Sequence, residues 1–234
     1  MTALMYIGVA VIGYLLGSIP FGLFIGKIFA KKDVREVGSG KIGMTNVLRA
    51  AGKKAAALSL VLDIVKGVLA VIIAGLIFRD KTDTVAAIIT LNESAKMLAG
   101  FAAIAGHSWS IFLKFKGGRG VATFMGGLAA LYWPAALLGG ICIFGIGIRT
   151  KYMSLGSIIG AVTAFFLLMA FYVLKIDFLR AEPMPFEYVL FAMAGAIFIY
   201  IMHRDNILRL FNGTERKIGE KTKVQASPST NTPK

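Results

Sequence analysis

The sequence is poor in cysteine, histidine and acidic residues. Its one cysteine, Cys142, has no second cysteine with which to form an intrachain disulfide. Because it lies inside an apolar block, its expected role is packing. The two histidines, His107 and His203, are 96 positions apart and form no local metal-binding pair, and no Gly-x-Ser-x-Gly elbow is present. We therefore expect no metal site and no cofactor.

Long apolar runs dominate what is present. Apolar residues make up 57% of the 234 residues, which is too many for a soluble domain of this size. Runs near twenty residues match the hydrocarbon thickness of a bilayer, and in lipid they must be helical because every backbone group needs an internal partner. The runs that carry no charge, or only Asp63 and Lys66, are 4–24, 55–78, 121–148, 153–174 and 189–202.

The charges predict how these runs are oriented. The net charge is +14, and the excess lies in four segments: 27–54, 114–119, 149–151 and the tail from His203. Together they hold 20 basic and 5 acidic residues, whereas the loops at 79–96 and 175–187 hold 5 basic and 6 acidic ones. The positive-inside rule puts the four basic segments in the cytoplasm. Basic residues that flank apolar spans predict contact with membrane lipid and no nucleic-acid partner.

The run 121–148 must return to the side on which it starts, because both of its ends are basic. We predict two short helical arms folded near Trp133 and Pro134, each about 20 Å long at about 1.5 Å per residue. The chain is then an all-α polytopic membrane protein with about seven transmembrane helices, or five if the hairpin does not span. Its N-terminus is expected outside and its C-terminus in the cytoplasm. We expect one domain over 1–216 and a polar, disordered cytoplasmic tail over 217–234.

A glycine-rich segment precedes the second apolar run. It reads Gly-Ser-Gly-Lys-Ile-Gly-Met-Thr-Asn over 38–46, and Arg49 follows. Such a backbone can curl around an anion, Thr45 or Asn46 is suited to cap the next helix, and a helix N-terminus favours a phosphate. The segment favours a phosphate site, and the alternative is a flexible loop. The residues assigned to this site are Ser39, Arg49, Gly38, Gly40, Gly43, Thr45 and Asn46.

A second glycine-rich turn precedes the run 121–148, after the sequence Gly-His-Ser-Trp at 106–109. Two such loops on one membrane face suggest a ligand held from two sides. The alternative for Lys116 and Arg119 is ordinary anchoring of a helix end. His107 has no carboxylate near it in the sequence, so a structural role is expected. The residues assigned to this site are Arg119, Lys116, Gly117, Gly118 and Gly120.

Two further pairs lie at helical spacing. His203 and Asn206 share a helix face where the last apolar run ends, which suits hydrogen bonds to a polar substrate, although a simple helix terminus is the alternative. Asp63 and Lys66 share a face inside the second apolar run, and a structural ion pair is favoured over a catalytic one.

Together these motifs resemble those of the bacterial membrane acyl-phosphate:glycerol-3-phosphate acyltransferase family. The resemblance reaches about Arg216 and includes Leu-Gly-Ser-Ile-Pro-Phe-Gly at 16–22 and Asp-Ile-Val-Lys-Gly at 63–67. It implies a seven-helix fold in the bacterial cytoplasmic (inner) membrane and a site that faces the cytoplasm. The implied reaction moves a fatty acyl group from acyl phosphate to glycerol 3-phosphate, giving lysophosphatidic acid and inorganic phosphate, the first acylation of phospholipid synthesis. The implied catalytic residues are Ser39, Arg49, Arg119, His203 and Asn206.

Three positions depart from the family pattern. Lys41 stands where the family usually has Asn, Arg119 where it usually has Lys, and Ser110 where it often has Pro. Arg119 keeps the positive charge but replaces a point charge with a planar fork. The rival functions are a transporter of a phosphorylated anion, which would be expected to place cations near the bilayer midplane, and a scaffold that binds anionic lipid. The scaffold leaves both glycine-rich loops without a purpose.

Overall fold

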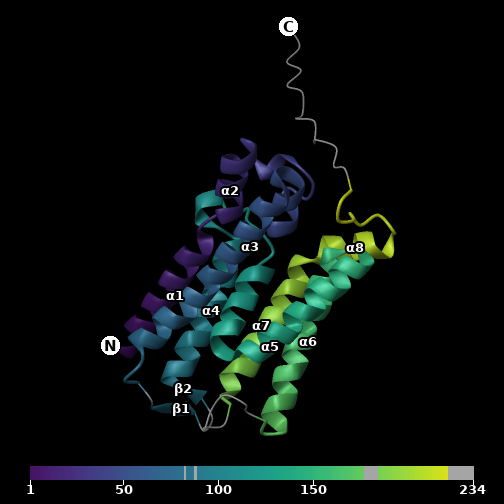
Figure 1. Ribbon diagram of the computed structural model, residues 1–234. Coiled ribbons are helices and arrows are strands. Elements are labelled where there is room, and N and C mark those ends of the chain that lie inside the picture. Colours follow the sequence, from purple (N-terminus) through teal and green to yellow (C-terminus); the bar gives the residue numbers. More distant parts are fainter. Residues whose placement is uncertain (82, 87–88, 177–183, 221–234) are drawn as a thin grey trace.

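The computed structural model describes residues 1–81, 83–86, 89–176 and 184–220, which form a bundle of helices (Figure 1). The longer helices are α1 (Thr2–Ser18), α3 (Met44–Ile77), α4 (Leu91–Ser108), α5 (Val121–Thr150), α6 (Met153–Val173) and α7 (Phe186–Met202). The shorter elements are α2 (Phe21–Ala30), the 3-10 turns η1 (Val34–Glu36) and η2 (Ile111–Leu113), the antiparallel strands β1 (Thr84–Ala86) and β2 (Ile89–Thr90), and α8 (Arg204–Phe211).

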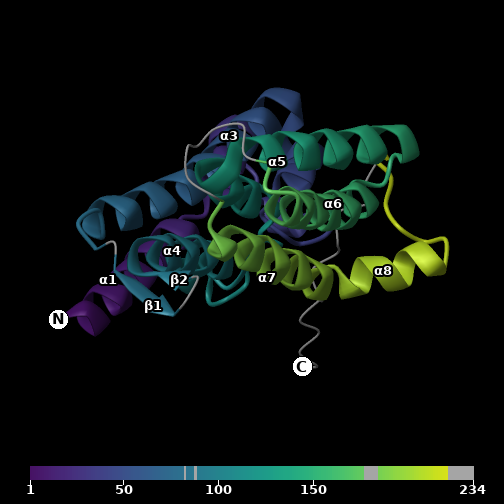
Figure 2. The ribbon, with the colours of Figure 1, turned by 90° about the horizontal axis from the view of Figure 1, so that it is seen from below.

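The helices pack in two neighbouring groups, seen along the bundle in Figure 2. One group is α1, α3 and α4, the other is α5, α6 and α7, and contacts of α3 with α5 and of α4 with α7 join them. Small residues allow close approach, as in many membrane bundles. A Cβ atom at Gly13 or Gly17 would clash with the backbone of Ala99 or Ala103, so α1 and α4 touch backbone to backbone.

The described chain has the surface of a membrane protein. Four segments are long and apolar enough to cross a bilayer. The first is formed by α1 and α2 together, and the other three are α3, α5 and α6. The pair α7 and α8, bent by 59°, is a fifth candidate. Large apolar side chains such as Leu76, Phe166 and Ile197 are exposed on the outside, as expected for a surface that lipid covers. The predicted all-α membrane fold is confirmed. The seven crossings and the orientation of the termini stay predictions, as does the tail, whose residues 221–234 lie outside the described residues.

The first span is broken at Ile19 and Pro20. Proline has no N–H, and the regular helical hydrogen bonds end at this break. Side chains from elsewhere donate to the carbonyl groups there: the Ser110 hydroxyl to the carbonyl oxygen of Ser18 (2.6 Å), and the Lys66 ammonium to that of Ile19 (3.0 Å), which also accepts from the N–H of Phe21 (3.1 Å). The break therefore ties α1 to α3 and to the turn after α4.

Helix α5 folds back on itself, as the charge pattern predicts. The backbone leaves helical geometry at Tyr132 (φ −152°, ψ 90°), two residues before Pro134. The terminal methyl carbon of Met125 lies only 3.5 Å from a Cβ position built on Gly139 and 3.8 Å from one on Gly140. In a straight helix fourteen residues would separate these positions by about 21 Å. Both ends of α5 consequently lie at the same end of the bundle (Figure 1).

Candidate active site

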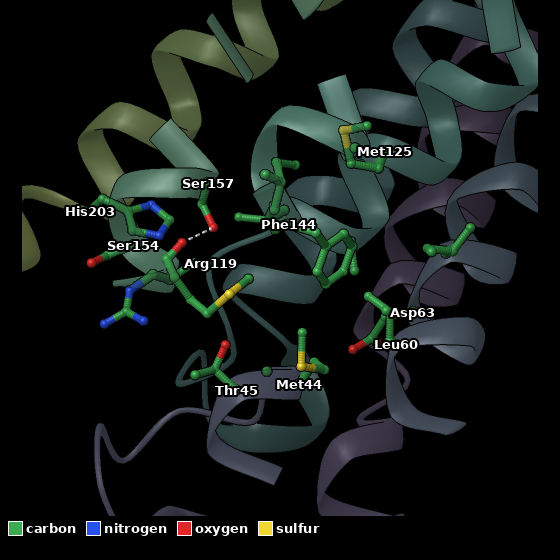
Figure 3. Close-up of a pocket in the computed structure, with 18 of the residues that line it drawn as sticks. Met44, Thr45, Leu60, Asp63, Arg119, Met125, Phe144, Ser154, Ser157 and His203 are labelled. Carbon is green, nitrogen blue, oxygen red and sulfur yellow. Dashed lines mark hydrogen bonds between the residues drawn. The ribbon is translucent and has the colours of Figure 1, made fainter. Parts of the chain in front are cut away.

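A cavity of about 650 Å³ lies between the start of α3, both arms of α5, the start of α6 and the corner between α7 and α8. In Figure 3, Arg119, Ser154 and His203 lie on one side of it, and Leu60 and Asp63 lie on the other. The predicted site residues that line the cavity are Ser39, Gly43, Thr45, Asn46, Arg49, Arg119, Gly120, His203 and Asn206. All three sequence motifs therefore meet at one cavity.

The first loop is held by Asn46, which is 2% exposed. Its amide nitrogen donates to the carbonyl oxygens of Val34 (2.6 Å) and Lys41 (2.8 Å), and its amide oxygen accepts from the N–H of Ser39 (3.1 Å). The predicted helix cap at Thr45 or Asn46 is wrong. The cap is Gly43, which has no side chain to form a cap bond, and Asn46 lies inside the first turn of α3 with its amide bonded to the loop. Gly38 and Gly40 have positive φ and shape this loop but do not line the cavity.

The second loop presents Arg119 from a turn that packs on His107. The N–H of Gly117 donates to the carbonyl oxygen of Ser108 (3.0 Å), and that of Gly118 donates to His107 (3.0 Å). A Cβ atom at Gly118 would clash with the His107 imidazole, so glycine is required for close packing there. Gly117 and Gly118 are buried behind the cavity, and Lys116 is exposed beside it. Burial lowers the pKa of Arg119 to about 10, so its guanidinium is still cationic at neutral pH.

The third motif is organised by Glu215. Its carboxylate accepts hydrogen bonds from the Asn206 amide (2.6 Å), the Ser154 hydroxyl (2.8 Å) and the Arg209 guanidinium (2.7 Å). Burial alone would raise the pKa of Glu215, but these three donors lower it below its usual value. Asn206 and Ser154 are thereby fixed at the wall of the cavity.

His203 is also fixed in orientation. Its Nδ1 lies 2.8 Å from the carbonyl oxygen of Ile199, which can only accept, so Nδ1 carries the hydrogen. In the neutral ring Nε2 is then an acceptor. The side chain is 3% exposed and lines the cavity. It can therefore accept a proton or a hydrogen bond from a hydroxyl group bound there.

The cavity continues as an apolar groove along the α5 hairpin. Met125 and Ala129 line it from the first arm, and Leu137 and Phe144 from the second, with Trp133 at the turn. Trp133 and Leu137 are about half exposed, at 53% and 54%, on the lipid-facing surface. The groove is therefore open sideways to the region that a bilayer occupies.

Comparisons with known proteins agree with this architecture. The model of the family described as glycerol-3-phosphate acyltransferase matches residues 7–213. Glycerol-3-phosphate acyltransferase 3 of Dehalococcoides mccartyi is 48% identical over 216 residues, covering 92% of this chain and 96% of that one. The chain belongs to the glycerol-3-phosphate acyltransferase family. It is thus an integral membrane acyltransferase. The Rhodopseudomonas palustris relative is 41% identical over 217 residues, covering 92% of this chain and 97% of that one.

Solved structures share the fold of this acyltransferase. The crystal structure of PlsY (YgiH), an integral membrane glycerol 3-phosphate acyltransferase, in its glycerol 3-phosphate form superimposes with a TM-score of 0.73 at 32% identity. The match covers 92% of this chain and 96% of that one. The lysophosphatidic acid form of PlsY gives the same TM-score and identity.

The acyltransferase also contains a buried ionic cluster beside its cavity. The Lys66 ammonium lies 2.8 Å from the Asp63 carboxylate, and His107 Nδ1 lies 3.4 Å from the same oxygen. All three side chains are at most 3% exposed, and Asp63 and His107 line the cavity. The predicted Asp63–Lys66 ion pair is confirmed. The carboxylate beside His107 was missed because it lies on another helix. The role of Glu215 was missed too, because a loop after α8 folds it back onto Asn206 and Arg209 and against Ser154 of another helix.

Proposed function

We propose that this cavity transfers a fatty acyl group from acyl phosphate to glycerol 3-phosphate. The observation that carries the proposal is the joining of a cationic pocket to an apolar, lipid-open groove in one cavity. A long-chain acyl phosphate has this same division between a charged head and an apolar chain. The products are lysophosphatidic acid and inorganic phosphate, so the reaction starts phospholipid synthesis.

The polar end supplies groups for both phosphates and for the attacking hydroxyl. Arg49 and Arg119 bind phosphate oxygens, which guanidinium groups do through strong, often bidentate hydrogen bonds. Ser39 and the amides of its loop orient the phosphate. His203 and Asn206 position glycerol 3-phosphate. The cavity surface contributed by Gly43, Thr45 and Gly120 belongs to the same binding region.

The apolar groove holds the acyl chain. Its walls are the two arms of α5, and its exposed side lets a chain enter from the bilayer without crossing water. A chain that moves from the bilayer into the groove exchanges one apolar surrounding for another, so the groove fixes the position of the acyl chain without a large gain from removing it from water. The α5 hairpin thus brings a lipid substrate to a cavity that also admits a small polar one.

The chemistry relies on an activated donor. An acyl phosphate is a mixed anhydride, so attack of the glycerol 3-phosphate hydroxyl forms the new ester C–O bond and breaks the bond from the carbonyl carbon to the phosphate oxygen. The hydroxyl proton passes to the leaving phosphate or to Nε2 of His203. Positioning and charge stabilisation are the main demands on the protein, which the fixed side chains of Asn206 and His203 meet.

We further propose that the protein lies in the bacterial cytoplasmic membrane with this cavity facing the cytoplasm. The four basic segments of the sequence support this orientation through the positive-inside rule. Glycerol 3-phosphate then arrives from the cytoplasm and the acyl donor from the bilayer.

Purified protein in an uncharged detergent, given palmitoyl phosphate and glycerol 3-phosphate, tests the proposal. We expect equal amounts of released phosphate and lysophosphatidic acid, unchanged activity with a chelator present, and none with palmitoyl-CoA as donor. Activity with palmitoyl-CoA but not palmitoyl phosphate would overturn the donor assignment. Transport of glycerol 3-phosphate into vesicles without any covalent product would instead support the transporter.

A further inference from the structure

Four cations converge on the cavity: Lys41, Arg49, Arg119 and Arg216. Lys41 comes from the loop before α3, and Arg216 comes from the segment after α8, so they approach from different parts of the fold. Within the described residues, none of the four side chains has a carboxylate within 4.0 Å or donates a side-chain hydrogen bond. Their charges are therefore not compensated by ion pairs in the described structure.

The acids that line the cavity are already paired with other cations. The Asp63 carboxylate lies 2.8 Å from Lys66, and the Glu215 carboxylate lies 2.7 Å from Arg209. Neither Lys66 nor Arg209 lines the cavity. Because each of these acids is neutralised by its own cation, the positive charge of the cavity comes from Lys41, Arg49, Arg119 and Arg216.

The four cations act on one another. Burial lowers the pKa of Lys41, and the like charges of Arg119 and Lys116 lower it further, while Asp205 opposes them. Burial also lowers the pKa of Arg119, and the like charges of Arg209 and Arg216 lower it further, while the carboxylates of Glu215 and Asp205 raise it. Arg216 is the like charge that acts most strongly on Arg49. Like charges gathered in a partly buried place disfavour the empty fold and favour anion binding.

We propose that Lys41 and Arg216, together with Arg49 and Arg119, form a four-cation site that holds two phosphate groups at the same time. A phosphate monoester carries about 1.5 to 2 negative charges at neutral pH, so two of them match four cations, whereas one leaves about half of the charge uncompensated. This proposal rests on the proposed function, in which both substrates carry a phosphate. It assigns Lys41 and Arg216 to phosphate binding and predicts that donor and acceptor are bound together before transfer.

The test measures phosphate binding without turnover. Inorganic phosphate is titrated calorimetrically into the full chain in uncharged detergent, with glycerol 3-phosphate already saturating and ionic strength held constant with chloride. The variants are Lys41→Gln and Arg216→Gln, and the control is Lys54→Gln, which removes an equal charge from an exposed position on α3 that does not line the cavity. Melting temperatures of the ligand-free proteins accompany each titration.

We expect wild type to bind phosphate while glycerol 3-phosphate is bound. Each cavity variant should weaken phosphate about tenfold, or about 1.4 kcal/mol, and the Lys54→Gln control should bind as wild type does. The ligand-free melting temperature should not fall in either cavity variant, because like-charge repulsion is removed. Lys41→Arg should restore the affinity, which separates charge from packing.

Two results would overturn this inference: phosphate that binds only when glycerol 3-phosphate is absent, or wild-type affinity in both cavity variants. Neither measurement uses the acyl donor. If palmitoyl phosphate is not a substrate but the variants still weaken phosphate, the proposed donor fails and the four-cation site stands.

Discussion

At the scale of single residues, the two arginines assigned to phosphate are held in different ways. Arg49 projects from the first turns of α3, whose start is fixed by the Asn46 hydrogen bonds. Arg119 precedes Gly120, whose φ of 81° lies in the left-handed region and sets the entry into α5. Arg49 therefore lies on the short helical segment of α3 that ends at the break at Gly52 (φ 83°, ψ −177°), whereas Arg119 lies on a turn.

We predict that Arg49→Ala and Arg119→Ala each lower turnover about a hundredfold, or roughly 3 kcal/mol of transition-state stabilisation. Arg119→Lys should keep substantial activity, because a lysine on a turn can still place its charge near the phosphate. Arg49→Lys should lose more, since the helical backbone at this position leaves a shorter-reaching ammonium less freedom than a turn does. Steady-state rates of folded variants check this. Near wild-type turnover in both alanine variants would show that these loops anchor the protein in the membrane and do not bind substrate.

The carboxylate of Glu215 gives a second residue-scale prediction. Its lowered pKa means that it stabilises the fold above its unfolded pKa of about 4.3, and that this contribution is lost as pH falls through the folded pKa. The melting temperature of wild type should thus drop between about pH 5 and pH 3, and Glu215→Gln should flatten that drop while being less stable at pH 7. Glu220→Gln, at an exposed acid nearby, should follow the wild-type curve. If the melting temperature of Glu215→Gln fell with pH as steeply as that of wild type, the assignment to Glu215 would be wrong.

At the scale of elements, the α5 hairpin provides the groove. Gly140 lines the cavity, and a Cβ atom there has only the Met125 methyl at 3.8 Å, so a larger side chain would project into the groove. We predict that Gly140→Leu raises the Michaelis constant for palmitoyl phosphate about tenfold and leaves that for glycerol 3-phosphate unchanged. The matched control is Gly145→Leu, on the exposed face of the same arm with open space around it. Equal effects at both positions would place the acyl chain elsewhere.

The break in the first span makes a further prediction for elements. Lys66 neutralises Asp63 and also donates to the carbonyl oxygen of Ile19, so Lys66→Met leaves a buried carboxylate with only the His107 imidazole beside it. This should cost about 3 to 5 kcal/mol of stability. Asp63→Asn combined with Lys66→Met should be less damaging than Lys66→Met alone and should leave the chemistry largely intact in folded protein. Melting temperatures of the three proteins in detergent decide this. A double variant less stable than Lys66→Met would contradict an ion pair.

At the scale of the whole molecule, the charge distribution predicts one orientation. Positions 114, 149 and 217 belong to basic segments, and position 83 belongs to a loop without basic excess. Single cysteines at these positions in a Cys142→Ala background should react with an impermeant thiol reagent in intact cells only at position 83. Labelling at 114 or 217 before lysis would show that the protein has the opposite orientation and that the cavity faces the outside.

The sequence by itself determined the membrane fold and its basic end. These follow from run length, charge and glycine spacing, which are properties of contiguous residues and need no knowledge of packing. The same reasoning predicted the hairpin in α5, because two basic ends at 119 and 149 cannot lie on opposite sides. It also brought Ser39, Arg49, Arg119, His203 and Asn206 together at one membrane surface, where the structure has them around one cavity.

Only the tertiary structure decided how that cavity is built. Gly117 and Gly118 turn toward His107 instead of the cavity, because α4 and the following loop fold back on each other there. Glu215 collects donors from α6 and α8, Asp63 meets a histidine from α4, and Lys41 faces the same space as Arg216. Ser154 with Glu215, Asp63 with His107 and Lys41 with Arg216 are pairings of residues far apart in the chain. Helix packing sets such distances, and no local pattern of residues records them.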